Sequence, residues 1–260
     1  MSAAFYAFLF FGGSTGGFFS GMLGIGGGII MFPLLLYLPQ VLGFSAIDVK
    51  SITGLTMAQG FFASATAMLW HQKQRLVNRT LVMTLGPTLF LASLSGALIS
   101  KTMSDTLLLC ILGMLSLVAA VTMLIPRSYF KDEDIADQVS FSKGKAIVIG
   151  VPVGFFLGLV GQGGAFIIIP ILLYLLKIPL RVALGSTLAI GLFSATAGLV
   201  GKAATGQIPF LMAATLVLGA LPAAAAGSIV SKKTKVQFLR WLLAAVICAT
   251  AIKIWTGIAL

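Results

Sequence analysis

Two glycine clusters are the residues whose type and spacing most clearly suggest binding chemistry. They are Gly24, Gly26, Gly27 and Gly28 early in the chain, and Gly161, Gly163 and Gly164 far along it. Glycine lets the backbone turn sharply and brings bare N–H groups close to a ligand. A short apolar segment follows each cluster, and a helix beginning there would present free N–H groups, which attract anions. The clusters therefore predict a binding site for a small anion.

Polar side chains elsewhere in the apolar segments could complete this substrate site. The candidates are Gln59, Gln162, Thr56, Ser186 and Thr187. A buried amide needs hydrogen-bond partners, and a substrate could supply them. The alternatives are an interhelical bond of structural use for the amides and a bond to the preceding helical turn for the hydroxyls.

The acidic residues do not form a catalytic or metal site. All six lie at segment ends or in one polar stretch in the middle of the chain. There is no Ser/His/Asp set, no cluster of metal ligands and no phosphate-loop lysine, so we predict neither an enzyme nor a cofactor. Ion-coupled carriers usually place a carboxylate inside the membrane. Its absence predicts uniport, facilitated efflux or a substrate that carries its own proton.

The elements that position these residues follow from composition. Of 260 residues, 59% are hydrophobic and only 9% are charged, whereas a soluble domain carries about 25% charged residues. A soluble enzyme is excluded, and an all-α polytopic membrane protein is expected. A membrane-spanning helix needs about 20 residues, so there is room for roughly eight to ten. The net charge of +11 reflects basic loops at the lipid bilayer and does not indicate nucleic acid.

Apolar segments alternate with breaks in the same order in both halves. In the first half we expect segments at 3–22, 29–43, 50–70, 80–100 and 105–125. In the second half we expect them at 145–160, 165–177, 181–201, 209–230 and 236–257. The second segment of each half is short, so it either spans the membrane or is re-entrant.

The two halves are repeats. Residues 17–38 align without gaps to 154–175, and more than half of the aligned positions are identical. The match continues further on, where Lys50 falls on Arg181 and Thr56 on Thr187. We therefore predict a first membrane repeat over 1–126, a polar linker over 127–145 and a second repeat over 146–260, which together form one transport domain.

The distribution of basic residues predicts that the second repeat is inverted. With an odd number of crossings per half, one side of the membrane holds all but a few of the 17 Lys and Arg residues. The exceptions are Lys50, Lys101, Lys202 and Lys253. An even number would divide the charges almost equally, against the positive-inside rule. The linker is then cytoplasmic, both termini lie outside, and the multi-pass chain sits in the cytoplasmic (inner) membrane. Inverted repeats with matching glycine breaks are typical of transporters.

Other small residues have structural interpretations. The fourfold spacing of Gly13, Gly17 and Gly21 suits close helix packing, as does that of the second-half glycines Gly150, Gly154 and Gly158. Pro33 and Pro170 match across the repeats and predict helix kinks, which can also free a carbonyl.

At these motifs the chain resembles the sulfite exporter TauE/SafE family of membrane permeases. The resemblance is carried by Gly21 to Gly28 with Pro33, by Gly158 to Gly164 with Pro170, and by Gly185 to Thr187. It implies transport, with export favoured, of a small anion such as sulfite, an organosulfonate or a related sulfur-containing organic acid. We expect alternating access between the repeats. The alternatives are an anion channel that uses the same glycine loops, and a non-transporting membrane scaffold. The oligomeric state is left open.

Overall fold

The computed structural model describes residues 2–72, 77–124, 141–161 and 165–259 of the chain. Within them it contains ten α-helices and one short 3-10 helix, and no strand. Six of the helices are long and apolar enough to cross a membrane. The all-helical prediction is therefore confirmed.

The helices fall where the apolar segments predict them. The first half forms α1 (Ala3–Leu23), α2 (Gly28–Val41), α3 (Val49–Gln72), α4 (Arg79–Ile99), η1 (Ser100–Thr102) and α5 (Asp105–Leu124). The second half forms α6 (Lys143–Val160), α7 (Ala165–Tyr174), α8 (Leu180–Ala204), α9 (Phe210–Lys233) and α10 (Val236–Ala259). The short segments are the short helices α2 and α7.

Local capping explains several of these boundaries. The Asn78 side chain accepts a hydrogen bond of 2.8 Å from the Leu81 N–H and begins α4. The Asp48 carboxylate accepts one of 2.8 Å from the Ser51 N–H at the start of α3. Such side-chain acceptors satisfy N–H groups that have no partner inside the helix.

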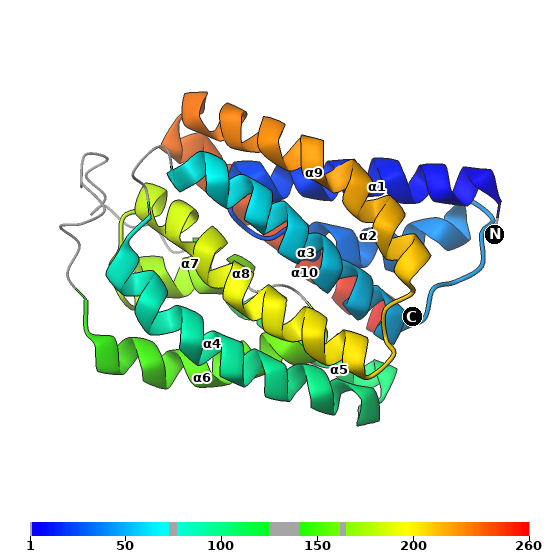
Figure 1. The fold of residues 1–260 in the computed structure, drawn as a ribbon, viewed down its shortest axis with the longest axis horizontal. Coiled ribbons are helices and arrows are strands. Elements are labelled where there is room, and N and C mark those ends of the chain that lie inside the picture. Colours follow the sequence, from blue (N-terminus) through cyan, green and yellow to red (C-terminus); the bar gives the residue numbers. More distant parts are fainter. Residues whose placement is uncertain (1, 73–76, 125–140, 162–164, 260) are drawn as a thin grey trace.

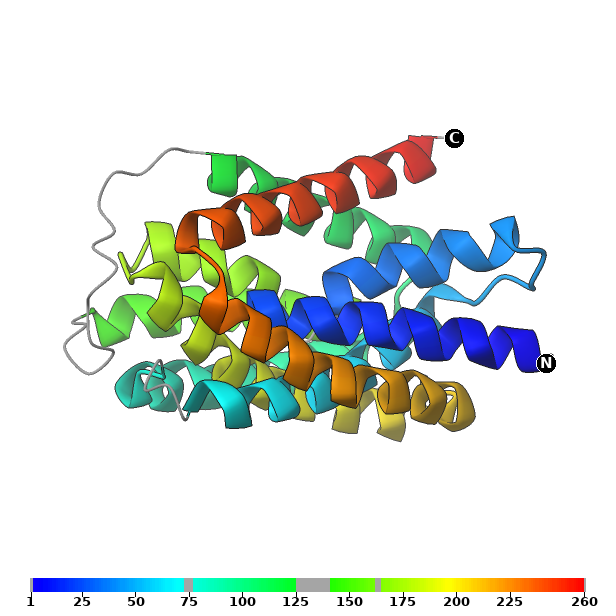
Figure 2. The ribbon, with the colours of Figure 1, turned by 90° about the horizontal axis from the view of Figure 1, so that it is seen from above.

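The long helices run roughly along one axis, as Figure 1 shows, and both marked chain ends lie toward the same end of the molecule in Figures 1 and 2. α1 packs along α9, α4 packs between α6 and α8, and α5 packs on α10. α3 packs against both α8 and α9. Among the candidate spans α8 is the most enclosed, with 78% of its most apolar stretch buried against 33 to 44% for the others. α3 and α8 therefore lie between α9 and α4 (Figure 1).

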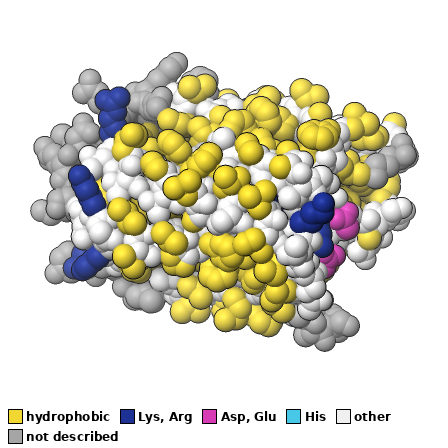
Figure 3. All heavy atoms as spheres, turned by 60° about the horizontal axis from the view of Figure 1, so that its bottom comes forward, with side chains coloured by type: hydrophobic (Ala, Val, Ile, Leu, Met, Phe, Trp, Pro, Cys, Tyr) yellow, Lys and Arg dark blue, Asp and Glu magenta, His cyan; other side chains and the backbone are white. Residues whose placement is uncertain are grey.

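The outer surface suits lipid. Large apolar side chains such as Phe11, Val148, Phe210 and Trp241 are more than half exposed. Figure 3 shows hydrophobic side chains over the middle of one face, with Lys and Arg side chains toward its two ends. An apolar band between charged ends is what a bilayer requires.

The glycines with fourfold spacing bring pairs of helices into close contact. A Cβ at Gly17 or Gly21 of α1 would overlap the carbonyl of Ala220 or Ala224 of α9. A Cβ at Gly158 of α6 would overlap the Ser93 carbonyl of α4. The packing role predicted for these glycines is confirmed, because only a residue without a side chain permits this approach.

Candidate functional site

The first glycine cluster forms a tight turn between α1 and α2. Gly24, Gly26 and Gly27 have φ values of 68°, 72° and 73°, a left-handed conformation that glycine adopts at little cost. Gly27 is the N-cap of α2, which begins at Gly28. The predicted helix start directly after the cluster is thus confirmed, and its first N–H groups lack partners inside the helix.

Gln59, on α3, faces this turn. Its side chain is fully buried, and neither Nε2 nor Oε1 has a hydrogen-bond partner within the described part of the chain. A Cβ at Gly27 would lie 3.1 Å from Gln59 Nε2, and one at Gly16 would overlap it. A buried amide without partners costs about 1–3 kcal/mol. The structure therefore places a donor and an acceptor, both without partners among the described residues, beside a helix N-terminus.

The second glycine cluster follows α6. Gly161 has a φ of 71° and caps α6, and α7 begins at Ala165. The predicted site residues between them lie outside the described residues: Gln162, Gly163 and Gly164. Their roles stay predictions.

Two predicted hydroxyls hold the glycine turns from the opposite half of the chain. Thr56 Oγ1, on α3, donates a hydrogen bond of 2.7 Å to the Gly161 carbonyl. Thr187 Oγ1, on α8, donates one of 3.3 Å to the Gly24 carbonyl. Both hydroxyls also approach carbonyls one turn back in their own helices, as the alternative interpretation expects. Each turn is therefore supported by the central helix of the other half.

Ser186 also has a partner in the other half. It is fully buried, and its Oγ accepts a hydrogen bond of 2.9 Å from the Asn78 N–H at the start of α4. The structure thus places Gln59 and Thr187 at the first glycine turn and Thr56 at Gly161 of the second, whereas Ser186, also on α8, bonds the start of α4.

The proline in α2 frees a carbonyl, as predicted. Pro33 lacks the N–H that would bond the Ile29 carbonyl, and that carbonyl accepts a hydrogen bond of 3.1 Å from Thr250 Oγ1 of α10. Pro170 removes the corresponding donor for Phe166 in α7. The freed Ile29 carbonyl therefore joins α10 to α2.

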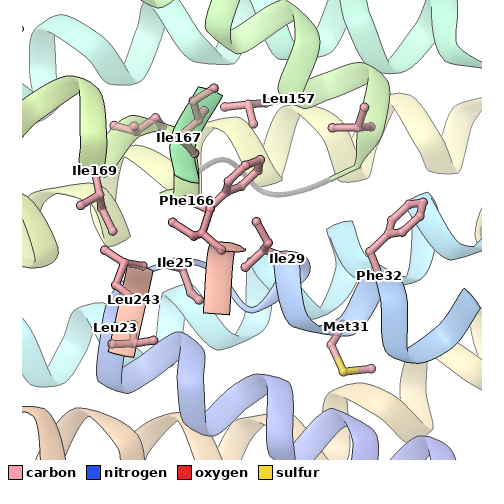
Figure 4. Packing of buried hydrophobic residues seen from close by; sticks show 14 of the residues in the cluster. Leu23, Ile25, Ile29, Met31, Phe32, Leu157, Phe166, Ile167, Ile169 and Leu243 are labelled. Carbon is pink, nitrogen blue, oxygen red and sulfur yellow. The ribbon is translucent and has the colours of Figure 1, made fainter. Parts of the chain in front are cut away.

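The starts of α2 and α7 approach each other in the core. Ile29 and Phe166 are each the second residue of their helix, both are fully buried, and both belong to one hydrophobic cluster. Figure 4 shows the two side chains directed toward each other between the helices. The two short helices thus begin close together in an apolar interior, where a bound charge is poorly screened.

Lys202 is a polar group that sequence analysis missed. We assigned it to a charged membrane boundary, but its side chain is fully buried. Its Nζ donates to Thr53 Oγ1 and Ser100 Oγ at 2.8 Å each. The Leu159 carbonyl at 3.1 Å and Gln207 Oε1 at 3.3 Å share its third N–H group. The sequence did carry one signal of this burial: Lys202 lies within the length of a membrane span and not in the loop beyond it.

Lys50 lies near this group. Its Nζ donates a hydrogen bond of 2.9 Å to the Lys101 carbonyl, just beyond α4. A lysine at a helix C-terminus stabilises the carbonyls left unpaired there. Lys50 and Lys202 are therefore both bonded to neutral oxygens, and the exposed Lys101 lies beside them in the chain segment that both contact.

Relatives of the chain are membrane transporters by name. It is 24% identical over 242 residues to "Probable membrane transporter protein YunE" of Bacillus subtilis, covering 86% of this chain and 88% of that protein. It is 32% identical over 195 residues to "Probable membrane transporter protein" of Xylella fastidiosa, covering 70% of this chain and 68% of that protein. No solved structure matches the chain.

The family described as "Sulfite exporter TauE/SafE" matches residues 9–254, nearly the whole chain. This match agrees with the glycine motifs and with the helical, lipid-facing architecture. The chain is thus a multi-pass membrane transporter and not an enzyme, and it belongs to the sulfite exporter TauE/SafE family.

Proposed function

We propose that this transporter exports a small anion across the cytoplasmic membrane. The substrate is sulfite, an organosulfonate or a related sulfur-containing organic acid. The proposed binding residues are Gly24, Gly26, Gly27, Gly28, Thr56, Gln59, Gly161, Gln162, Gly163, Gly164, Ser186 and Thr187. A sulfur oxyanion is small, acts as a hydrogen-bond acceptor and is negatively charged, which suits glycine N–H groups at helix starts.

One observation carries the proposal. Gln59 is fully buried beside the N-cap Gly27, and its amide has no protein partner within the described residues. An anion at the α2 N-terminus would accept from Gln59 Nε2 and from the first N–H groups of the helix. Both the amide donor and those N–H groups would then be satisfied.

Alternating access between two inverted repeats is the mechanism we propose. The repeats cover 1–126 and 146–260, and 127–145 is the cytoplasmic linker. The reciprocal bonds from Thr56 to the Gly161 carbonyl and from Thr187 to the Gly24 carbonyl support a pseudo-symmetric site. Rocking of one repeat against the other around this site would expose it to each side in turn.

The direct test is anion binding by the detergent-purified protein, followed by flux in proteoliposomes. The panel is sulfite, thiosulfate, sulfoacetate, simple carboxylates, sulfate and chloride. An anion present at 100 times its dissociation constant should add roughly 2.7 kcal/mol to stability. Saturable flux with exchange between unlike anions supports a carrier. Flux at channel rates would instead show that the protein is an anion channel.

Gln59→Leu locates the site. Because the amide has no partner within the described residues, its removal should leave the melting temperature unchanged or raise it. The anion-induced shift should be lost. Gln40→Leu is the matched control, because Gln40 is exposed and bonds only the preceding turn of α2. A folded wild-type protein that responds to no anion of the panel would contradict the function. An unchanged response in Gln59→Leu would contradict the site.

A further inference from the structure

Within the described residues, the buried Lys202 ammonium has no carboxylate among its bonded partners. Its four bonded oxygens belong to two hydroxyls, an amide and a backbone carbonyl, all neutral. The acidic residues within the described part of the chain are Asp48 and Asp105, and neither is among its bonded partners. Burying an ion without an opposite charge is costly. An uncompensated charge in an apolar interior attracts an anion strongly.

The ammonium lies next to the proposed anion site. Thr53, which accepts from Lys202, also packs its carbonyl so closely on Gly161 that a Cβ there would overlap it. Leu159, another acceptor, lies two residues before Gly161 in the chain. The second glycine turn is therefore flanked by a buried positive charge.

Polar residues recur at every third position along α3. The stripe consists of Lys50, Thr53, Thr56 and Gln59. At a rise of about 1.5 Å per residue it covers roughly 14 Å of the helix. Lys202 meets this stripe at Thr53, Gly161 meets it at Thr56, and the first glycine turn meets it at Gln59. Each step of three residues turns the helix by about 300°, so the stripe winds half-way around α3. It leads from Lys50, past Lys202 at Thr53 and Gly161 at Thr56, to Gln59 on the opposite side of the helix.

We propose that Lys202 is an anion-recognition residue on the route between the outer side and the glycine turns, an inference that rests on the proposed anion transport. In the closed arrangement described here, neutral oxygens take up its N–H groups. When the outer side opens, the longer bonds, to Leu159 at 3.1 Å and to Gln207 at 3.3 Å, yield to an oxygen of the anion. The charge then recognises the substrate and is neutralised by it.

The route is asymmetric between the two halves. In α8 the positions that match Thr53 and Gln59 are Leu184 and Ile190, both buried and apolar. The polar stripe therefore exists only on α3. α8 ends toward the end of the molecule that carries both termini (Figure 1), which is the outer side by the distribution of basic residues. Lys202 accordingly serves the outer half of the route.

Lys202→Met, Lys202→Arg and the control Lys101→Met test the proposal. Lys101 has an exposed side chain beyond α4, near the same network. Lys202→Met removes a costly buried charge but leaves its oxygen partners without that donor, so its folding is first checked by thermal melting. Its dissociation constant for the anion that stabilises the wild type should rise about 10- to 100-fold, because a charged hydrogen bond is lost. Lys202→Arg should retain more affinity, and Lys101→Met should bind as the wild type does.

A measurement on the wild type does not depend on the variants folding. Reductive methylation of lysines, read by peptide mass spectrometry, should label Lys202 slowly. A saturating panel anion should slow that labelling further while leaving Lys101 unaffected. If an anion known to bind leaves the labelling rate of Lys202 unchanged, the proposal is overturned. Normal affinity and flux in Lys202→Met would do the same while leaving the proposed function intact. If the wild-type protein binds no anion, the result instead contradicts the proposed anion transport on which the inference rests.

Discussion

The Thr56 hydroxyl on α3 donates a hydrogen bond of 2.7 Å to the carbonyl of Gly161, which lies 105 positions further along the chain. Gly161 caps α6 at the turn that leads to α7. A side chain from the first half therefore holds the backbone of a turn in the second half. Thr187 on α8 makes the matching but longer contact with the Gly24 carbonyl at 3.3 Å, while its shortest acceptor is the Ala183 carbonyl at 2.7 Å. The two glycine turns are thus fixed by contacts between the halves.

Thr56→Val tests this support. Valine keeps the shape of threonine but leaves the buried Gly161 carbonyl without its donor. We expect a loss of about 1–2 kcal/mol in stability, together with weaker anion binding. Chemical denaturation and anion-induced thermal shifts measure the two effects. Thr66→Val is the control, because Thr66 bonds only the preceding turn of α3. Equal stability losses in both variants would show that the bond to Gly161 contributes nothing.

Gly27→Ala tests the first turn. Gly27 has a φ of 73°, and an added Cβ would lie 2.7 Å from the Gly16 carbonyl oxygen and 3.1 Å from Gln59 Nε2. Gly43 has a φ of 77° but nothing within 4 Å of an added Cβ. Gly43→Ala should therefore cost only the left-handed strain, about 1–2 kcal/mol. Gly27→Ala should cost more and should abolish the anion response. Loss of stability without loss of anion binding in Gly27→Ala would place the substrate elsewhere.

Membrane topology is tested by labelling single cysteines. In a background in which Cys110 and Cys248, both free thiols, are replaced by serine, Thr102→Cys should react with an impermeant maleimide added to intact cells. Lys143→Cys should react only after the membrane is opened. Both positions are exposed in the structure, so a difference reports the side of the membrane. The expectation follows from the basic residues near the linker, and the reverse pattern would invert the proposed topology.

Much of the site was predictable because its residue types are unusual in a membrane. The glycine clusters and Gln59 stand out against apolar surroundings, and the structure places Gln59 against the first cluster. Lys202 was missed because a lysine near the end of an apolar segment normally extends to the headgroups. Its burial depends on Thr53, Ser100 and Gln207, which come from different elements of the chain.

The sequence by itself determined the order of the helices and their approximate limits, within about three residues. Hydropathy sets the length of a span, and glycine and proline mark its breaks, so these features are local. Only the tertiary structure decided that Gln59 has no partner within the described residues, that Thr56 and Thr187 bond the opposite turns, and that Lys202 folds inward. Each of these depends on which distant segments pack together. That choice rests on helix–helix packing across the whole chain, which no local pattern records.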